Sequence, residues 1–265
     1  MKKIVSLILA TFFTLFCFAS CNKDENTILV GESSTPHALI LEQVKADLKA
    51  QGYNLKIRIM DDYVTPNTAL ESGDIDANYF QHEPYLVDFN SKNGTHLVSV
   101  AKIHYEPLAI YSTTQSKTGL NIVIPNDGSN CTRALFLLQT EGYITLKSGV
   151  LPTDTLSDLD IADKKGNTVS LVEASTVPAQ YRNGNQNTIA VVNGNYALSA
   201  NLPKTEISAI ESGATKDTYA NLIAVKEGHE NDAKIQALVN ALKTQKVYDY
   251  ITSTFGGSVL PTFEI

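Results

Sequence analysis

Short strand patterns alternate with helical patterns along almost the whole of this 265-residue chain. Residues 55–59 (LKIRI) alternate apolar and polar side chains with period two, which is typical of a half-buried strand. Alternation of strands and helices predicts an α/β architecture with mainly parallel sheets. The expected strands are residues 28–30, 55–59, 74–80, 97–100, 108–111, 121–125, 169–172, 188–192, 207–210 and 222–225.

Helix boundaries are marked by capping residues and helix breakers. Ser34, Thr35 and Pro36 supply a cap and a first-turn proline for a helix that should end before Gly52. Residues 232–255 carry apolar side chains at helical spacing and predict one long amphipathic helix at the end of the chain. Further helices are expected at residues 66–70, 83–89 and 129–142.

The N-terminus has the pattern of an export signal. Two lysines precede an apolar run over residues 4–18, which is shorter than the roughly twenty residues that span a bilayer. Small residues then precede Cys21, and this arrangement resembles a bacterial lipobox. We therefore expect a signal peptide at 1–20 and an acylated (palmitate-type) anchor and tether at 21–26. An ordinary signal peptide or a short membrane anchor remains an alternative.

Composition excludes several classes of protein. Without residues 1–20 the chain has 19 basic and 28 acidic residues, so its formal charge changes from -7 to -9. An acidic chain without a basic cluster is a poor candidate for binding nucleic acid. Its three cysteines provide no disulfide framework, because Cys17 leaves with the signal, Cys21 is the expected anchor and Cys131 stands alone. Folding must therefore rest on hydrophobic cores.

Five motifs, in register along the chain, resemble the MetQ/NlpA-type methionine-binding lipoproteins. They are DYVTPN at 62–67, SGDIDANYFQHEPYL at 72–86, PND with a following Asn and RAL at 125–135, VNGNYA at 192–197 and YANL at 219–222. One such motif would be weak evidence, but five in the family's order are specific. The chain is therefore expected to share the family's fold and its class of ligand.

The resemblance implies a two-lobe periplasmic-binding-protein fold (type 2) with the ligand in the cleft between the lobes. We expect the first lobe to comprise residues 27–111 and 217–265, and the second lobe residues 112–216. The chain should cross between lobes near Tyr111 and again between Ser212 and Asn221. The implied partners are the permease and ATPase subunits of an ABC importer, with the receptor a monomer held at the outer face of the membrane or in the periplasm. No cofactor or metal is implied.

A bound amino acid needs a partner for its carboxylate, and Arg133 has suitable chemistry. Its planar guanidinium can bind two oxygens at once, and it lies in the first turns of an expected helix, where free backbone N–H groups favour anions. Asn130 can share that helix face. Both residues match the family, although Gly128 and Ser129 replace its usual proline and threonine. The resemblance thus assigns Asn130 and Arg133 to the ligand, with an altered loop around them.

An aromatic wall would suit a thioether side chain. Contact between sulfur and an aromatic ring contributes roughly 0.3–1.5 kcal/mol, and burial of the apolar chain adds about 1.5–3 kcal/mol. The resemblance assigns Tyr63, Phe80, His82 and Tyr85 to this wall. From the residues alone, Phe80 and Tyr85 could equally be core residues, and His82 could be a structural histidine.

Asparagine amides suit the head group because an amide both donates and accepts hydrogen bonds. The resemblance assigns Asn195 and Asn221 to this role. Asn193 in the same motif is expected to serve a turn or cap.

The sequence contains none of the common catalytic motifs, such as a lipase Gly-x-Ser-x-Gly or a P-loop, so we expect no enzyme. Cys131 is expected to be a small buried residue rather than a nucleophile. Within the binding class, L-methionine, its other stereoisomer, a methionine-containing dipeptide and another apolar amino acid all remain open. A surface lipoprotein that acts mainly through protein contacts is the alternative from another class.

Overall fold

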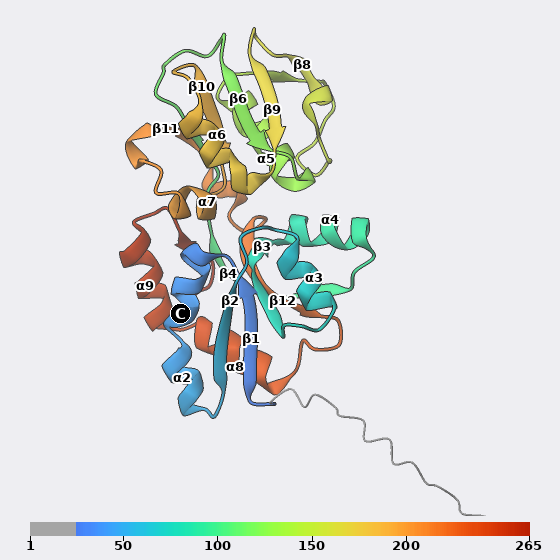
Figure 1. Cartoon of the computed structure of the whole chain (residues 1–265), viewed down its shortest axis with the longest axis vertical. Helices are drawn as coiled ribbons and strands as arrows, with labels where there is room; N and C mark the ends of the chain where they lie inside the picture. Colours follow the sequence, from blue (N-terminus) through green and yellow to red (C-terminus); the bar gives the residue numbers. More distant parts are fainter. Residues whose placement is uncertain (1–24) are drawn as a thin grey trace, which may run out of the picture.

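A computed structural model describes residues 25–265 and shows two lobes stacked along the long axis of the molecule (Figure 1). The signal peptide at 1–20 and the anchor Cys21 lie outside the described residues. Both ends of the described chain lie in the same lobe, with the second lobe inserted between them (Figure 1). Among the helices of this described region, none is long and apolar enough to cross a membrane.

The first lobe is built on a six-stranded sheet in the order β13-β4-β12-β3-β1-β2. The strands β1, β2 and β3 are parallel, whereas β12 runs antiparallel to both β3 and β4. The sheet is therefore mixed rather than mainly parallel, because the chain returns from the second lobe in β12. The strands are β1 (Thr27–Glu32), β2 (Asn54–Ile59), β3 (Ala77–His82), β4 (Leu97–Tyr105), β12 (Ala220–Lys226) and β13 (Leu260–Pro261).

Helices cover both faces of this sheet. Apolar side chains such as Leu41, Leu238 and Ile251 form the main core with Ile28 on one face. Leu70 and Leu86 pack on the other face with Leu222 of β12. The helices are η1 (Ser34–Ala38), α1 (Leu39–Glu42), α2 (Lys45–Ala50), α3 (Thr65–Glu71), α4 (Glu83–Asn93), α8 (Ala233–Leu242) and α9 (Gln245–Phe255).

The second lobe has a five-stranded sheet in the order β11-β5-β10-β6-β9 and a short β7-β8 hairpin. One core packs α5 against one face of the sheet, and a smaller core packs α6 and α7 against the other. Its strands are β5 (Ala109–Tyr111), β6 (Asn121–Pro125), β7 (Thr145–Leu146), β8 (Ile161–Asp163), β9 (Thr168–Val172), β10 (Thr188–Val192) and β11 (Ile207–Ile210). Its helices are α5 (Gly128–Thr140), η2 (Asp158–Asp160), η3 (Ala174–Thr176), α6 (Val177–Asn183), α7 (Gly194–Ser199), η4 (Lys204–Glu206) and η5 (Gly213–Thr215).

The first crossing between the lobes differs from the sequence-based expectation. Tyr111 was expected at the crossing, but β5 pairs with β10 and β11 of the second sheet. The chain therefore crosses at 106–108, immediately after β4. It returns between the end of β11 and the start of β12.

Two expected helices are interrupted. Thr35 has an extended backbone, as expected for a residue before proline, and the helix after it is divided near Val44. The C-terminal helix is likewise divided into α8 and α9, because Thr244, directly before α9, has an extended backbone. Apolar periodicity continues through both breaks, so the sequence pattern did not reveal them.

Glu32, at the end of β1, provides a test of the first lobe. It is fully buried, and its carboxyl oxygens have no hydrogen-bond partner among residues 25–265. Burial raises its pKa from 4.5 to about 8. The folded state therefore binds more protons than the unfolded chain between these values, so stability falls as the pH rises through this window.

We expect Glu32→Gln to remove this pH dependence. Its free energy of unfolding should exceed that of the wild type by an amount that grows from about pH 5 to about pH 8.5, reaching on the order of 3 kcal/mol. Urea denaturation at both pH values measures the difference. The exposed Glu227→Gln serves as the control. Parallel pH profiles for E32Q and wild type would contradict the assignment.

Candidate functional site

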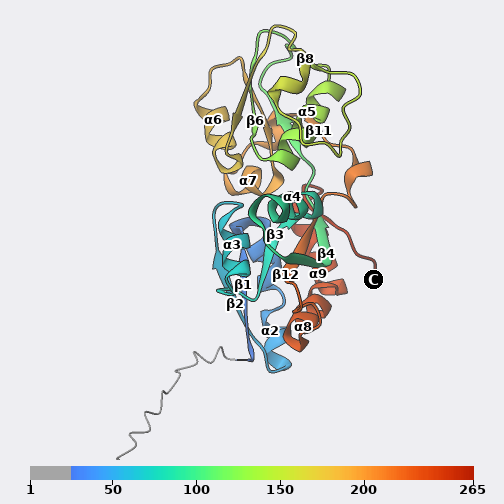
Figure 2. The same cartoon turned by 90° about the vertical axis from the view of Figure 1, so that its right-hand side faces the viewer.

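The residues predicted to bind ligand converge from both lobes on the boundary between them. Helix α4 of the first lobe and helix α7 of the second face this boundary (Figure 2). Strand β3 ends there, as do β6 and β10, which lead directly into α5 and α7. The first lobe contributes Tyr63, Phe80, His82, Tyr85 and Asn221, and the second contributes Asn130, Arg133 and Asn195.

The aromatic wall forms as a cluster around Tyr63. Its ring centroid lies 5.7 Å from that of Phe80 and 5.6 Å from that of Tyr85. The Tyr85 hydroxyl donates to the backbone oxygen of Tyr63 at 2.9 Å, which fixes the loop before α3. Tyr196 of the second lobe packs on Tyr63 with ring centroids 4.9 Å apart, and sequence reasoning missed it. The wall therefore includes side chains from both lobes.

His82 joins the two lobes and also caps a helix. Its Nδ1 accepts from the backbone N–H of Tyr85 at 3.3 Å, in the first turn of α4. Its Nε2 must then carry the proton, and it donates to Asn130 Oδ1 at 3.2 Å. Burial and the charge of Arg133 lower the pKa of His82 to about 3. The ring is therefore neutral at physiological pH, and its tautomer is fixed.

Arg133 is buried, and most of its guanidinium is already engaged. Its Nε and Nη2 bind the carboxylate of Glu211, with Nη2 to Oε2 at 2.5 Å. Nη2 also donates to the backbone oxygen of Glu106 at 3.0 Å, and the guanidinium carbon lies 4.2 Å from the Tyr219 ring centroid. Glu211 thus occupies the fork that we expected to hold a ligand carboxylate. The other nitrogen, Nη1, has only a 3.5 Å contact with Asn130 Oδ1.

Asp127 begins α5 and was not predicted as a site residue. Its Oδ1 accepts from the backbone N–H of Asn130 at 3.0 Å and from the Asn130 side chain at 2.9 Å. Its Oδ2 is buried without a partner in the part of the chain that the structure describes. Burial raises the pKa of Asp127. Burial raises the pKa of both Tyr63 and Tyr85, and the negative charge of Asp127 raises it further.

The altered loop packs closely against the first lobe. A Cβ atom at Gly128 would lie 2.9 Å from Thr155 Cγ2 and 3.2 Å from Asp88 Oδ2 of α4. Thr132 Oγ1 lies 3.0 and 2.8 Å from the backbone oxygens of Gly128 and Asp154, and its single hydroxyl hydrogen can be donated to either. Glycine thus permits this approach of α5 to α4, and the threonine holds the neighbouring 154 loop.

The three asparagines Asn193, Asn195 and Asn221 make contacts that differ from the roles predicted for them. Asn195 Oδ1 accepts from the Tyr63 hydroxyl across the lobes at 2.6 Å, and Asn221 Oδ1 accepts from His37 Nε2 at 2.9 Å. Asn193 makes no side-chain cap at α7, contrary to the role expected for it. Its Nδ2 donates to Asn130 Oδ1 at 2.9 Å, while its Oδ1 is buried without a partner among the described residues. Asn193 is therefore a candidate site residue.

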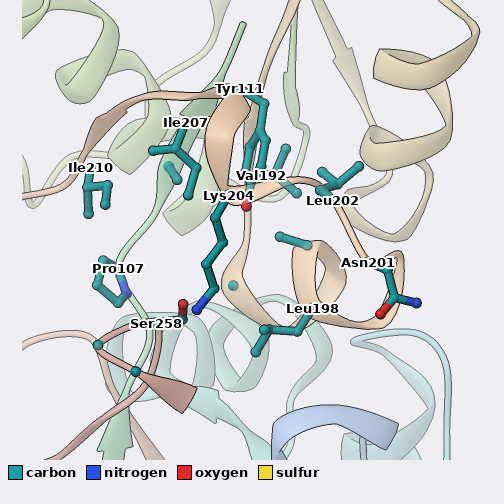
Figure 3. A pocket seen from close by; sticks show the side chains of 15 residues that line it. Pro107, Tyr111, Val192, Leu198, Asn201, Leu202, Lys204, Ile207, Ile210 and Ser258 are labelled. Carbon is teal, nitrogen blue, oxygen red and sulfur yellow. The ribbon is translucent and has the colours of Figure 1, made fainter. Parts of the chain in front are cut away.

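The other candidate features lie away from this cluster. Cys131 is buried, and burial raises the pKa of its thiol to about 12, as expected for a packed side chain. A cavity of about 740 Å³ lies between α7, β11 and residues 256–258, with Lys204 across it (Figure 3). None of the eight predicted ligand-binding residues lines this cavity. This cavity and the predicted ligand-binding residues therefore lie at different places.

Removal of the Arg133 guanidinium should destabilise the protein, because Glu211 would stay buried without its cation. We expect Arg133→Ala to lower the free energy of unfolding by about 3–5 kcal/mol. The double variant R133A/E211Q should recover part of this loss, since no buried charge remains. Urea denaturation at neutral pH measures both. If both variants lost the same free energy of unfolding, the unpaired Glu211 carboxylate would not be the cause of the loss.

Comparison with known proteins identifies the family of this chain. The family model described as NlpA lipoprotein matches residues 28–263. The chain is 39% identical over 246 residues to the membrane lipoprotein TpN32 of Treponema pallidum, covering 90% of this chain and 89% of the relative. It is 38% identical to the methionine-binding lipoprotein MetQ of Bacillus subtilis, with 89% and 88% covered.

Solved structures show the same two-lobe fold. A lipoprotein from Ruminococcus gnavus superposes with a TM-score of 0.84 at 46% identity, covering 90% of this chain and all of that one. A nutrient-binding protein from Burkholderia cenocepacia, solved with bound methionine, gives a TM-score of 0.82 at 36% identity, with 89% and 100% covered. The expected fold and resemblance are thereby confirmed, and the chain belongs to the NlpA lipoprotein family.

Proposed function

We propose that this protein is a lipid-anchored receptor that captures methionine between its lobes and delivers it to an ABC importer. Relatives at 38% and 32% identity are named as methionine-binding or D-methionine-binding lipoproteins, and one structural neighbour contains methionine. A neighbour from Coxiella burnetii is described as the periplasmic substrate-binding protein of an ABC transporter. These relationships favour binding and transport over catalysis.

One observation carries the proposal for an amino-acid head group. Two buried acceptors, Asp127 Oδ2 and Asn193 Oδ1, lack partners within residues 25–265. Both residues bind Asn130, which also contacts Nη1 of Arg133. A zwitterion supplies what these groups require, since its ammonium donates three hydrogen bonds and its carboxylate accepts from the arginine. We assign the ammonium to the two acceptors and the carboxylate to Nη1.

The side chain of the ligand would then lie against the aromatic wall. Tyr63, Phe80 and Tyr85 are held at edge or tilted angles to one another, so they present ring edges and faces to a flexible chain. A thioether gains from such contacts without requiring a hydrogen bond. This environment supports methionine over a polar amino acid.

Contacts across the boundary support a clamp mechanism. Tyr63 of the first lobe binds Asn195 of the second, and His82 binds Asn130. A ligand that contacts both sets of residues gains its full interaction energy only when the lobes are together, so it shifts the equilibrium toward the closed form. Free and loaded protein should therefore differ in overall dimensions.

The choice among methionine-like ligands is also proposed. We favour L-methionine, with D-methionine and a methionine-containing dipeptide as alternatives. A cavity of about 530 Å³ lies between α4 and residues 152–155, with Ser129 and Tyr219 on its wall. Because Tyr219 stacks on Arg133, this cavity adjoins the proposed carboxylate position and supports the dipeptide alternative.

The cellular setting follows from the family and from the N-terminus. Lipoprotein relatives support an anchor on Cys21 and a position outside the cytoplasm, either periplasmic or on the outer face. We propose a monomer that engages the permease and ATPase subunits of its importer.

Calorimetry with ligand analogues tests the assignment. Protein that starts at Asn22 is first denatured, and the small molecules that it releases are identified by mass spectrometry. The protein is then refolded and titrated with each ligand. We expect L-methionine to bind at least tenfold more tightly than methioninol, which lacks the carboxylate, and N-acetylmethionine, which lacks the ammonium. Norleucine, which has a methylene group in place of the sulfur, should bind more weakly than methionine because it lacks only the contact between sulfur and the aromatic rings. No binding of methionine in either configuration, or of glycylmethionine, would refute the proposal.

Asp127→Asn tests the ammonium assignment. An ammonium beside Asp127 would lower the pKa that burial has raised. Methionine should therefore bind most tightly above the raised pKa of Asp127. Its affinity should fall as the pH drops through that value and the carboxylate is protonated. We expect D127N to weaken binding at least tenfold at neutral pH and to abolish that pH dependence. The exposed Asp249→Asn on α9 is the matched control. Wild-type affinity in D127N would contradict the assignment.

A further inference from the structure

Glu106 occupies the first crossing between the lobes, directly after β4. Its side chain is only 5% exposed, and its Oε1 lies 2.7 Å from His104 Nε2 and 3.6 Å from His37 Nε2. Both histidines belong to the first lobe; His104 hydrogen-bonds the carboxyl group, and His37 packs beside it.

Hydrogen bonds define the tautomers of the two histidines. Burial lowers the pKa of His37 to about 4 and that of His104 to about 3, so both rings are neutral at physiological pH. Each Nε2 faces acceptors and must carry the ring proton. Each Nδ1 then accepts from a hydroxyl, from Ser33 in His37 at 2.7 Å and from Tyr79 in His104. The His104 ring is thus held as a hydrogen-bond donor to Glu106, while the His37 ring donates to Asn221 and lies beside Glu106.

These three side chains are also of types that bind metal ions, and their ligand atoms lie within 4.8 Å of one another. However, every ring nitrogen has a hydrogen-bond partner, and His37 Nε2 also donates to Asn221 Oδ1. A metal ion would have to displace protons from this satisfied network. The arrangement therefore favours a hydrogen-bonded network.

The same carboxylate contacts the second lobe. Burial raises the pKa of Glu106 to about 7, and the nearby backbone N–H of Asn195, in the first turn of α7, acts to lower it. The approach is close, because a Cβ atom at Gly194 would lie 2.6 Å from Glu106 Oε2 and 2.8 Å from its Cβ. Only glycine at position 194 allows α7 to reach the carboxylate without displacement.

We propose that Glu106 is a positioning residue for ligand binding, which holds α7 of the second lobe against the first lobe in the closed arrangement. Its backbone oxygen accepts from Arg133 Nη2, its carboxyl group lies against Gly194 at the start of α7, and His37 beside it donates to Asn221. Glu106 thereby orders three residues assigned to the ligand without contacting the ligand itself. The predicted effect of Glu106 on methionine affinity rests on the proposed function, whereas its predicted effect on the separation of the lobes does not.

The test combines lobe distances with affinity. Spin labels on the exposed Val87 of α4 and Leu159 of η2, introduced as V87C and L159C, report the separation of the lobes by pulsed electron resonance. Cys131 is buried and should not compete for label. Glu106→Met keeps the approximate volume and removes both acceptors. Gly194→Ala keeps Glu106 but obstructs the approach of α7. The exposed Glu173→Met is the matched control.

We expect E106M and G194A to populate longer distances than wild type, with and without methionine, and to weaken binding at least tenfold. E173M should match the wild type, circular dichroism should show all variants folded, and a chelator should leave the wild-type distances unchanged. Wild-type distances in both folded variants would overturn the proposal, as would a chelator-induced opening of the wild type. If wild type binds no methionine, the proposed function fails, and the ligand-free distances still decide the role of Glu106.

Discussion

The buried ion pair of Arg133 and Glu211 is the interaction on which the connection between the lobes depends. The Glu211 carboxylate also accepts from the Tyr105 hydroxyl at 2.9 Å and from the Leu108 backbone N–H at 3.2 Å. One carboxylate therefore joins the end of β4, both crossings and the first turns of α5. A buried ion pair adds little to the free energy of unfolding compared with apolar side chains of the same volume. Removal of one partner is strongly destabilising, because the other charge is left buried and unpaired. The ion pair fixes the position of Arg133 while leaving Nη1 for a ligand.

The direction of the strands explains why the polar groups gather at the boundary. In each lobe, parallel strands end on the side that faces the other lobe, and the next helix starts there. Asp127 follows β6 and Asn193 follows β10, so both stand at a strand end and a helix start. Ligands commonly bind beyond the carboxyl ends of strands in open α/β sheets for this reason. The aromatic wall at the end of β3 completes the site from the first lobe.

Sequence reasoning predicted most of the elements because each depends on local periodicity, and the five motifs identified the family. It failed where distant contacts decide the role of a side chain. Tyr63 and Asn195 are 132 residues apart yet share a hydrogen bond, and nothing local to Arg133 indicates that Glu211 occupies its fork. Asn193 could have been found, since it follows a buried strand in the same motif as Asn195. The helix breaks at Val44 and Thr244 depend on packing rather than on apolar pattern.

For the proposed receptor function, the unpartnered acceptors provide a way to distinguish the empty state from the loaded state. Closure without ligand buries Asp127 Oδ2 and Asn193 Oδ1 with no partner in the described chain. Each such group costs about 1–3 kcal/mol, so the two together cost roughly 2–6 kcal/mol. A penalty of that size lowers the population of the empty closed form by a factor of about 30 or more. In the proposed mechanism, a zwitterionic ligand would remove the penalty while contacting the wall, and the closed form would then be the form that carries ligand.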